Sequence, residues 1–228
     1  MKTYRERLSC WPCYARLLYR KTDILIASES PIDPEMGKRV LVRLWNELTG
    51  YLRKDPLFGM SLEPVRPRHY APEIAFEMAE AARQAGVGPM AAVAGAFAEG
   101  VARVYPGEIC VENGGDAFIR SRRERHIEVL SCNPRIPSVR IALPSGSWGI
   151  ATSSGKIGPS LSLGNAWAAT VVARSGALAD AWATRLGNEA GPGASPEKAL
   201  SVIRGADGVL GGMVISDESL ALWGLRLV

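Results

Sequence analysis

Apolar and polar residues alternate along two early segments, 14–20 and 23–28, which are separated by Lys21-Thr22. This two-residue period predicts an opening β-hairpin. From residue 33 to residue 54 the apolar positions recur every three or four residues, which predicts a helix that buries one face. Asp55-Pro56 is expected to end this helix, because proline cannot continue the hydrogen-bonding pattern.

The remaining pattern predicts helices and strands in separate blocks. Helical spacing is seen at 73–85 and 90–104, short runs of β-forming residues at 108–112, 117–120, 126–130, 139–143, 148–152 and 167–173, further helices at 177–188 and 196–203, and a terminal hairpin across 209–228. Because most strands follow one another with hairpin-length connections, we expect an α+β fold with helices packed on an antiparallel sheet. Residues 188–198 form the clearest flexible loop.

Composition agrees with a globular protein that has a substantial core, since 47% of the 228 residues are hydrophobic. The longest apolar runs, 90–98 and 166–173, are far shorter than the roughly 18 residues that span a bilayer. The first residues also lack a continuous apolar stretch with a cleavage site. We therefore expect no membrane partner, no secretory signal and a cytoplasmic location.

Charge and cysteine content restrict the function further. The net charge of +4 is mild, and the one dense basic run, 120–126, is interpreted as the solvated end of a hairpin. No stacking aromatic residues accompany it, so we expect no nucleic-acid partner. Cys10 and Cys13 have a C-x-x-C spacing without a second pair, and we interpret the spacing as incidental. With only two histidines, a bound metal is expected to have oxygen ligands.

The helix at 177–188 carries Asp180 and Thr184 one turn apart, so both oxygens lie on one face and could reach a cation such as Mg²⁺. A solvated Asp180 beside a Thr184 that bonds back to a carbonyl is the alternative. The helical segment 95–102 is lined by small residues, which favours close packing or approach of a ligand.

Two loops are candidates for binding. Asn113-Gly114-Gly115-Asp116 is a strong hairpin signal, and its glycines could also let backbone N–H groups contact a phosphate or a ring. Segment 152–164 holds hydroxyls, glycines and a lysine, but its spacing differs from that of a Walker loop. It is either a polar turn or an anion-binding loop.

Taken together, these segments resemble the FAD:protein FMN transferase (ApbE-like) superfamily. The ordered motifs are Gly95 to Gly100, Asn113 to Asp116, Thr152-Ser153-Ser154 and Ala179 to Thr184. Likeness to the smaller, poorly characterised bacterial and archaeal relatives covers nearly the whole chain. The resemblance implies a single T-fold-related domain over residues 1–228, with an N-terminal hairpin and helices up to about residue 87 and a motif-bearing region from about residue 88.

The resemblance also implies a site. Asp180, Thr184 and the carbonyl of Ala98 would bind Mg²⁺, which would bridge the pyrophosphate of FAD. The first loop, Asn113, Gly114, Gly115 and Asp116, and the second, Thr152, Ser153, Ser154 and Gly155, would border the flavin and its phosphates. A nucleotide or flavin, and a target protein that receives FMN, are the implied partners; the oligomeric state stays open.

Three positions depart from the family pattern. Glu99 stands where the transferases have lysine, and Pro159 and Trp167 stand where the smaller relatives have histidine and aspartate. Neither Pro159 nor Trp167 can accept a proton or bind a metal. Two alternatives to a transferase therefore stay open: a binding or accessory protein that has lost the chemistry, and a cytoplasmic role in sulfur assimilation and homocysteine formation, as is linked to some smaller relatives.

Overall fold

The computed structural model describes residues 11–155, 166–191 and 193–228. Its centre is an eight-stranded antiparallel sheet in the order β1-β2-β3-β4-β7-β8-β9-β10, and a smaller sheet has the order β11-β6-β5. The strands are β1 (Cys13–Tyr19), β2 (Thr22–Ser28), β3 (Ile109–Asn113), β4 (Asp116–Ser121), β5 (Arg125–Leu130), β6 (Ser138–Leu143), β7 (Gly146–Ser153), β8 (Ala168–Ala173), β9 (Val209–Ile215), β10 (Leu220–Trp223) and β11 (Arg226–Leu227).

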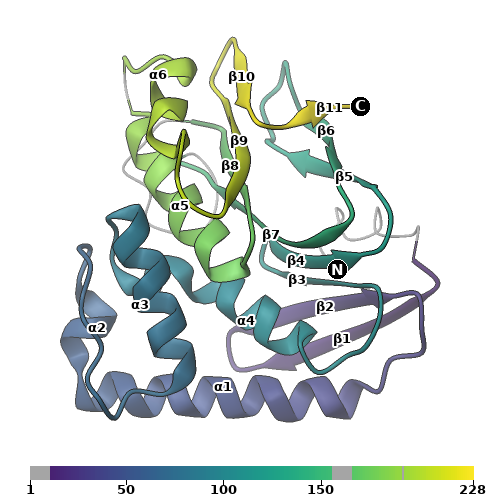
Figure 1. Ribbon diagram of the computed structural model, residues 1–228, viewed down its shortest axis with the longest axis vertical. Coiled ribbons are helices and arrows are strands. Elements are labelled where there is room, and N and C mark those ends of the chain that lie inside the picture. The colour runs from purple at the N-terminus through teal and green to yellow at the C-terminus, as the bar shows by residue number, and fades with distance from the viewer. Residues whose placement is uncertain (1–10, 156–165, 192) are drawn as a thin grey trace.

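The helices gather on one face of the large sheet (Figure 1). They are α1 (Pro34–Lys54), α2 (Pro56–Met60), α3 (Glu73–Ala85), α4 (Val93–Ala102), α5 (Gly176–Glu189) and α6 (Pro196–Leu200), with 3₁₀ turns at Pro89–Ala92 and Ser201–Ile203. Successive residues of a strand point to opposite faces of the large sheet. Val111 and Val171 pack under the helices, whereas Cys110 and Val172 pack toward the small sheet. The chain thus forms three layers.

The predicted α+β class is confirmed, and the predicted strands and longer helices are present. Local signals explain the boundaries. Asp33 caps α1 by accepting a hydrogen bond from the Glu35 N–H at 3.0 Å, and Gly86 ends α3 with a left-handed φ of 69°. The short α2 was not predicted, because five residues are too few for a helical period. The terminal hairpin includes only β9 and β10, since β11 leaves to pair with β6.

The interpretation of the basic run 120–126 as a solvated hairpin end is wrong. Strand β4 pairs with β7 and β5 with β6, so the run connects two sheets. The side chain of Arg125 is only 11% exposed and forms ion pairs with Glu29 at 2.5 Å and Glu108 at 2.6 Å. Its guanidinium also lies 4.1 Å from the ring centre of Trp11. These long-range partners were not visible in the local sequence.

No single helix among residues 11–155, 166–191 and 193–228 is long and apolar enough to cross a membrane. Two consecutive helical segments, Glu73–Ala85 and Pro89–Ala102, are long and apolar enough when taken together, by length and composition only. The chain bends by 104° between them. Most of their apolar residues are buried in the core of this fold.

Helices α4 and α5 touch through glycines. A Cβ atom added to Gly95 would lie 2.0 Å from the Gly176 carbonyl oxygen, and one added to Gly176 would lie 2.2 Å from the Gly95 carbonyl oxygen. Both distances are far inside van der Waals contact, and the obstructing atoms are backbone atoms. The two backbones can therefore approach this closely only because neither residue has a side chain.

We predict that Gly95→Ala lowers the free energy of unfolding by about 3 kcal/mol or more, because α4 and α5 must separate. Gly50→Ala in α1 is the matched control. The nearest heavy atom to its added Cβ is 3.9 Å away, so it should raise the free energy of unfolding by about 0.5–1 kcal/mol. Urea unfolding of both variants measures the difference, and equal effects would contradict the packing argument.

Candidate functional site

Asp180 is the residue around which the candidate site is built. Ser175 caps α5 by accepting a hydrogen bond from the Leu178 N–H at 3.2 Å, and the helix then carries Asp180 and Thr184 one turn apart. Both residues are partly buried. The Asp180 carboxylate accepts a hydrogen bond from the Gly95 N–H at 3.0 Å. Because Ala92 at the N-terminus of α4 has no side-chain acceptor, Asp180 supplies the cap for that helix from α5.

Glu99 makes the reverse contact. Its Oε2 accepts a hydrogen bond from the N–H of Gly176, the first residue of α5, at 2.8 Å. Its Oε1 pairs with Arg103 at 3.0 Å, and Arg103 also pairs with Glu77 at 2.6 Å. Each helix thus places a carboxylate on the N-terminus of the other, where the helix dipole favours negative charge. The carboxylate of Glu99, which stands where the transferases have lysine, is therefore paired within the protein by Arg103 and by the start of α5.

The Asn113–Asp116 turn faces the start of α4. Asn113 Nδ2 donates a hydrogen bond to the Ala94 carbonyl at 3.1 Å, and Gly114 and Gly115 have φ values of 72° and 115°. The predicted hairpin turn is therefore present, and it joins β3 to β4. Asp116 accepts a hydrogen bond from the Thr152 N–H at 3.1 Å, which ties this turn to the Thr-Ser-Ser segment at the end of β7.

Carboxylates raise one another's pKa here. Burial, followed by the charge of Glu112, raises the pKa of Asp116 to about 7 against a hydrogen bond from Thr152 that lowers it. Burial, followed by the charge of Asp116, raises the pKa of Asp180 well above its usual range. Glu112, whose Oε1 accepts from the Gly115 N–H at 2.7 Å, was not singled out in the sequence. The only available signal was its place directly before the glycine turn.

The second predicted loop is described only at its start. Thr152 Oγ1 lies 2.9 Å from Thr170 Oγ1, Ser153 is buried, and the Gly155 N–H donates to the Ala166 carbonyl at 3.1 Å. Pro159 and the rest of the loop lie outside the described residues, as does Cys10. Trp167 donates from Nε1 to Asp217 at 2.6 Å, so its ring is fixed against the β9–β10 turn.

Ala98, the third proposed ligand, lies three residues after Gly95 in α4. It is fully buried within α4, and helical carbonyls point toward the C-terminal end of their helix. Asp180 contacts the first turn of α4, at the Gly95 N–H. Across the described ranges no group of three or more histidine, cysteine, aspartate or glutamate side chains is arranged to hold a metal. Asp180 and Thr184 are therefore the core of the proposed ligand set.

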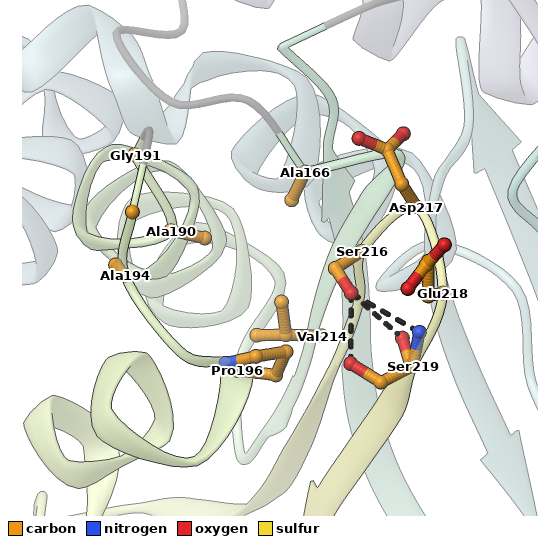
Figure 2. Close-up of a pocket in the computed structure, with 11 residues that line it drawn as sticks. Ala166, Ala190, Gly191, Ala194, Pro196, Val214, Ser216, Asp217, Glu218 and Ser219 are labelled. Carbon is orange, nitrogen blue, oxygen red and sulfur yellow. Dashed lines mark hydrogen bonds between the residues drawn. The ribbon is translucent and has the colours of Figure 1, made fainter.

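Two cavities lie along helix α5, and among the described residues neither is lined by Glu112, Asp116 or Asp180. The larger, of about 320 Å³, lies between the end of α5 and the β9–β10 turn, where Ser216 and Ser219 hydrogen-bond to each other (Figure 2). The smaller, of about 200 Å³, is lined from α3, α4 and α5 and includes Glu99 and Arg103.

The layered fold is that of flavin transferases. The structure is similar to the apo form of the flavinyl transferase ApbE of Pseudomonas stutzeri, with a TM-score of 0.58, 12% identity and coverage of 92% of this chain and 93% of that one. It is also similar to the flavin transferase ApbE of Vibrio cholerae, with a TM-score of 0.53, 15% identity and coverage of 92% and 96%. At these identities the likeness establishes the fold.

Sequence comparison defines the family. The model described as "AbpE bacteria" matches residues 8–199, and the chain belongs to this family. It is 39% identical to a UPF0280 protein of Methanosphaerula palustris, over 88% of each chain. It is 40% identical to a UPF0280 protein of Methanopyrus kandleri, over 81% of this chain and 77% of that one. The predicted kinship with the smaller ApbE-like relatives is confirmed.

We predict that the protein becomes less stable as pH rises from about 4 to about 7. In this window Asp116 still holds its proton in the folded state, whereas an unfolded aspartate has lost it, so unfolding releases a proton. Urea unfolding at several pH values measures the slope. Asp116→Asn should reduce this slope while keeping an acceptor for Thr152, and Asp180, whose pKa is also raised, supplies the remainder. Asp207→Asn, at an exposed ion pair with Arg174, should leave the slope unchanged.

Proposed function

We propose that the protein binds a flavin nucleotide, FAD, together with Mg²⁺, and that it acts on the diphosphate as a transferase-like enzyme. The observation that carries the proposal is the carboxylate of Asp180, which the Gly95 N–H orients beside a second carboxylate of raised pKa, Asp116. Supporting it are the flavin-transferase fold, the family match over residues 8–199 and the resemblance of Asn113–Asp116 and Ala179–Thr184 to motifs of the ApbE-like superfamily.

The residues present fit a divalent cation. Burial raises the pKa of both Asp116 and Asp180, and the charge of Asp116 raises that of Asp180 further, so a proton or a cation would stabilise these carboxylates. Mg²⁺ prefers oxygen ligands, which the Asp180 carboxylate and the Thr184 hydroxyl offer from one helix face. When bound, the ion would supply charge neutralisation for a diphosphate as one phosphoanhydride bond breaks. The Ala98 carbonyl is the third ligand that the family resemblance implies.

The surrounding residues have distinct roles in this proposal. Asp180 orients the cation and Thr184 adds a neutral oxygen. At neutral pH, Asp116 holds or releases a proton beside them, because its pKa is raised to about 7. Gly114 and Gly115 are exposed, and Cβ atoms added to them would meet nothing within 4 Å, so a ring could approach the backbone of the turn. Thr152, Ser153, Ser154 and Gly155 would border the phosphates.

The same proposal includes a target protein that accepts the flavin, a cytoplasmic location and a single domain over the whole chain.

A binding protein without turnover is the second candidate. It is favoured by Trp167, whose indole is fixed on Asp217 at the position where the smaller relatives have a carboxylate. The two candidates differ in one measurable product, because only the enzyme releases AMP from FAD.

We predict that Asp180→Asn keeps the fold but weakens Mg²⁺-dependent FAD binding at least tenfold. Asparagine retains an oxygen that accepts from the Gly95 N–H, so the cap of α4 survives, while the charge that attracts the cation is lost. Flavin fluorescence with and without Mg²⁺ measures binding, and chromatography measures AMP. Asp207→Asn, at an exposed aspartate, is the control. Unchanged Mg²⁺ dependence in Asp180→Asn would remove Asp180 from the metal site, and binding without AMP would select the second candidate.

A further inference from the structure

Three large apolar side chains protrude within six residues at one corner of the molecule. Leu57 is 57% exposed, Met60 72% and Leu62 68%. We call these three residues the α2 patch. Leu57 and Met60 lie three residues apart in α2 and therefore on the same helix face. Single exposed apolar residues are ordinary, but a contiguous group this exposed indicates a surface that contacts something apolar.

Helix α2, which carries two residues of the α2 patch, is anchored to the end of α1. Phe58 on the opposite face of α2 is fully buried and packs edge-to-face on Tyr51, with ring centres 5.1 Å apart. A Cβ atom added to Gly59 would lie 3.1 Å from a Leu52 methyl group, so α2 sits closely on the end of α1. The exposed side chains are thus presented on an anchored helix.

Positively charged residues flank the α2 patch in the sequence. Arg53 and Lys54 end α1 directly before α2, and Arg66 and Arg68 follow in the loop, all four being exposed. Arg53, Lys54 and Arg66 form no ion pair with any residue in the described ranges. Asp55 is buried and bound by Tyr51 at 2.9 Å, so Glu63 is the only exposed acidic residue between positions 53 and 69.

Exposed apolar residues together with nearby positive charge indicate what kind of partner the α2 patch contacts. A second copy packed across a two-fold axis would bring the same cations together, which is unfavourable. A partner peptide would require a groove, but neither of the two cavities described above is lined by residues of α2, which lies at the edge of the molecule (Figure 1). Exposed apolar side chains on a helix at the edge of the molecule, flanked in the sequence by lysine and arginine, suit the surface of an anionic bilayer.

We propose that the α2 patch docks reversibly on an anionic membrane surface. Leu57, Met60 and Leu62 enter the boundary between headgroups and acyl chains, and Arg53, Lys54 and Arg66 contact the lipid phosphates. This contact lies flat on the membrane and needs no spanning helix. It does not depend on the flavin site, and no site residue named above belongs to the patch.

Sedimentation with lipid vesicles tests the proposal. The full chain is mixed with vesicles of phosphatidylcholine containing 30% phosphatidylglycerol, or of phosphatidylcholine alone. The protein is expected to bind the anionic vesicles, and its binding to the neutral vesicles is expected to be at least tenfold weaker. It should also fall when salt is raised from about 0.05 to about 0.5 M, because salt screens the lysine and arginine contacts.

Two pairs of variants separate the apolar from the charged contribution. Leu57→Ser/Met60→Ser/Leu62→Ser should lower binding at least tenfold, whereas Tyr14→Ser/Leu18→Ser, at exposed residues of β1, should not. Arg53→Gln/Lys54→Gln should weaken binding severalfold, whereas Lys38→Gln/Arg39→Gln near the other end of α1 should not. Thermal unfolding checks that all four variants are folded.

The opposite results overturn the proposal. Absence of vesicle binding at low salt would do so, as would equal binding to neutral vesicles or equal loss in the control variants. Analytical ultracentrifugation provides the remaining outcome. If the chain forms a dimer that the triple serine variant abolishes, the α2 patch is an interface between two copies, and the membrane assignment is wrong.

Discussion

The reciprocal capping of α4 and α5 is the interaction on which the site depends. Gly95 and Gly176 bring the two backbones together, and each helix then supplies a carboxylate to the other's N-terminus, Asp180 to Gly95 and Glu99 to Gly176. Buried helix ends need such partners, because their first N–H groups have none within the helix. The same contact therefore joins the two helices and sets the orientation of the Asp180 carboxylate.

This arrangement gives two acidic residues of α4 and α5 different chemical environments. Glu99 is neutralised by Arg103 as well as by the start of α5, so its charge is satisfied within the protein. Asp180 instead faces Asp116, and burial together with this like charge raises its pKa. A carboxylate that is oriented but uncompensated is where a cation gains most. The departure at Glu99 thus concerns helix packing, while the proposed chemistry rests on Asp180.

The proposed flavin site and the α2 patch lie on different parts of the same fold. The motif-bearing loops meet at the starts of α4 and β4, tied by Asn113 and Asp116. The α2 patch lies beyond the far end of α1, on a short helix anchored by Phe58. A protein that both binds a nucleotide and rests on a membrane surface would hold these two regions independently, so either can be lost without the other.

The sequence by itself determined the period of the longer helices and of the strands, the glycine turn at 113–116 and the α+β class, because all of these depend on neighbouring residues. It also placed Asp180 and Thr184 on one helix face. Only the tertiary structure decided that β5 and β6 form a separate sheet with β11, that Arg125 is buried against Glu29, and that Asp180 caps α4. These outcomes depend on contacts between residues up to about a hundred positions apart, which local spacing cannot specify.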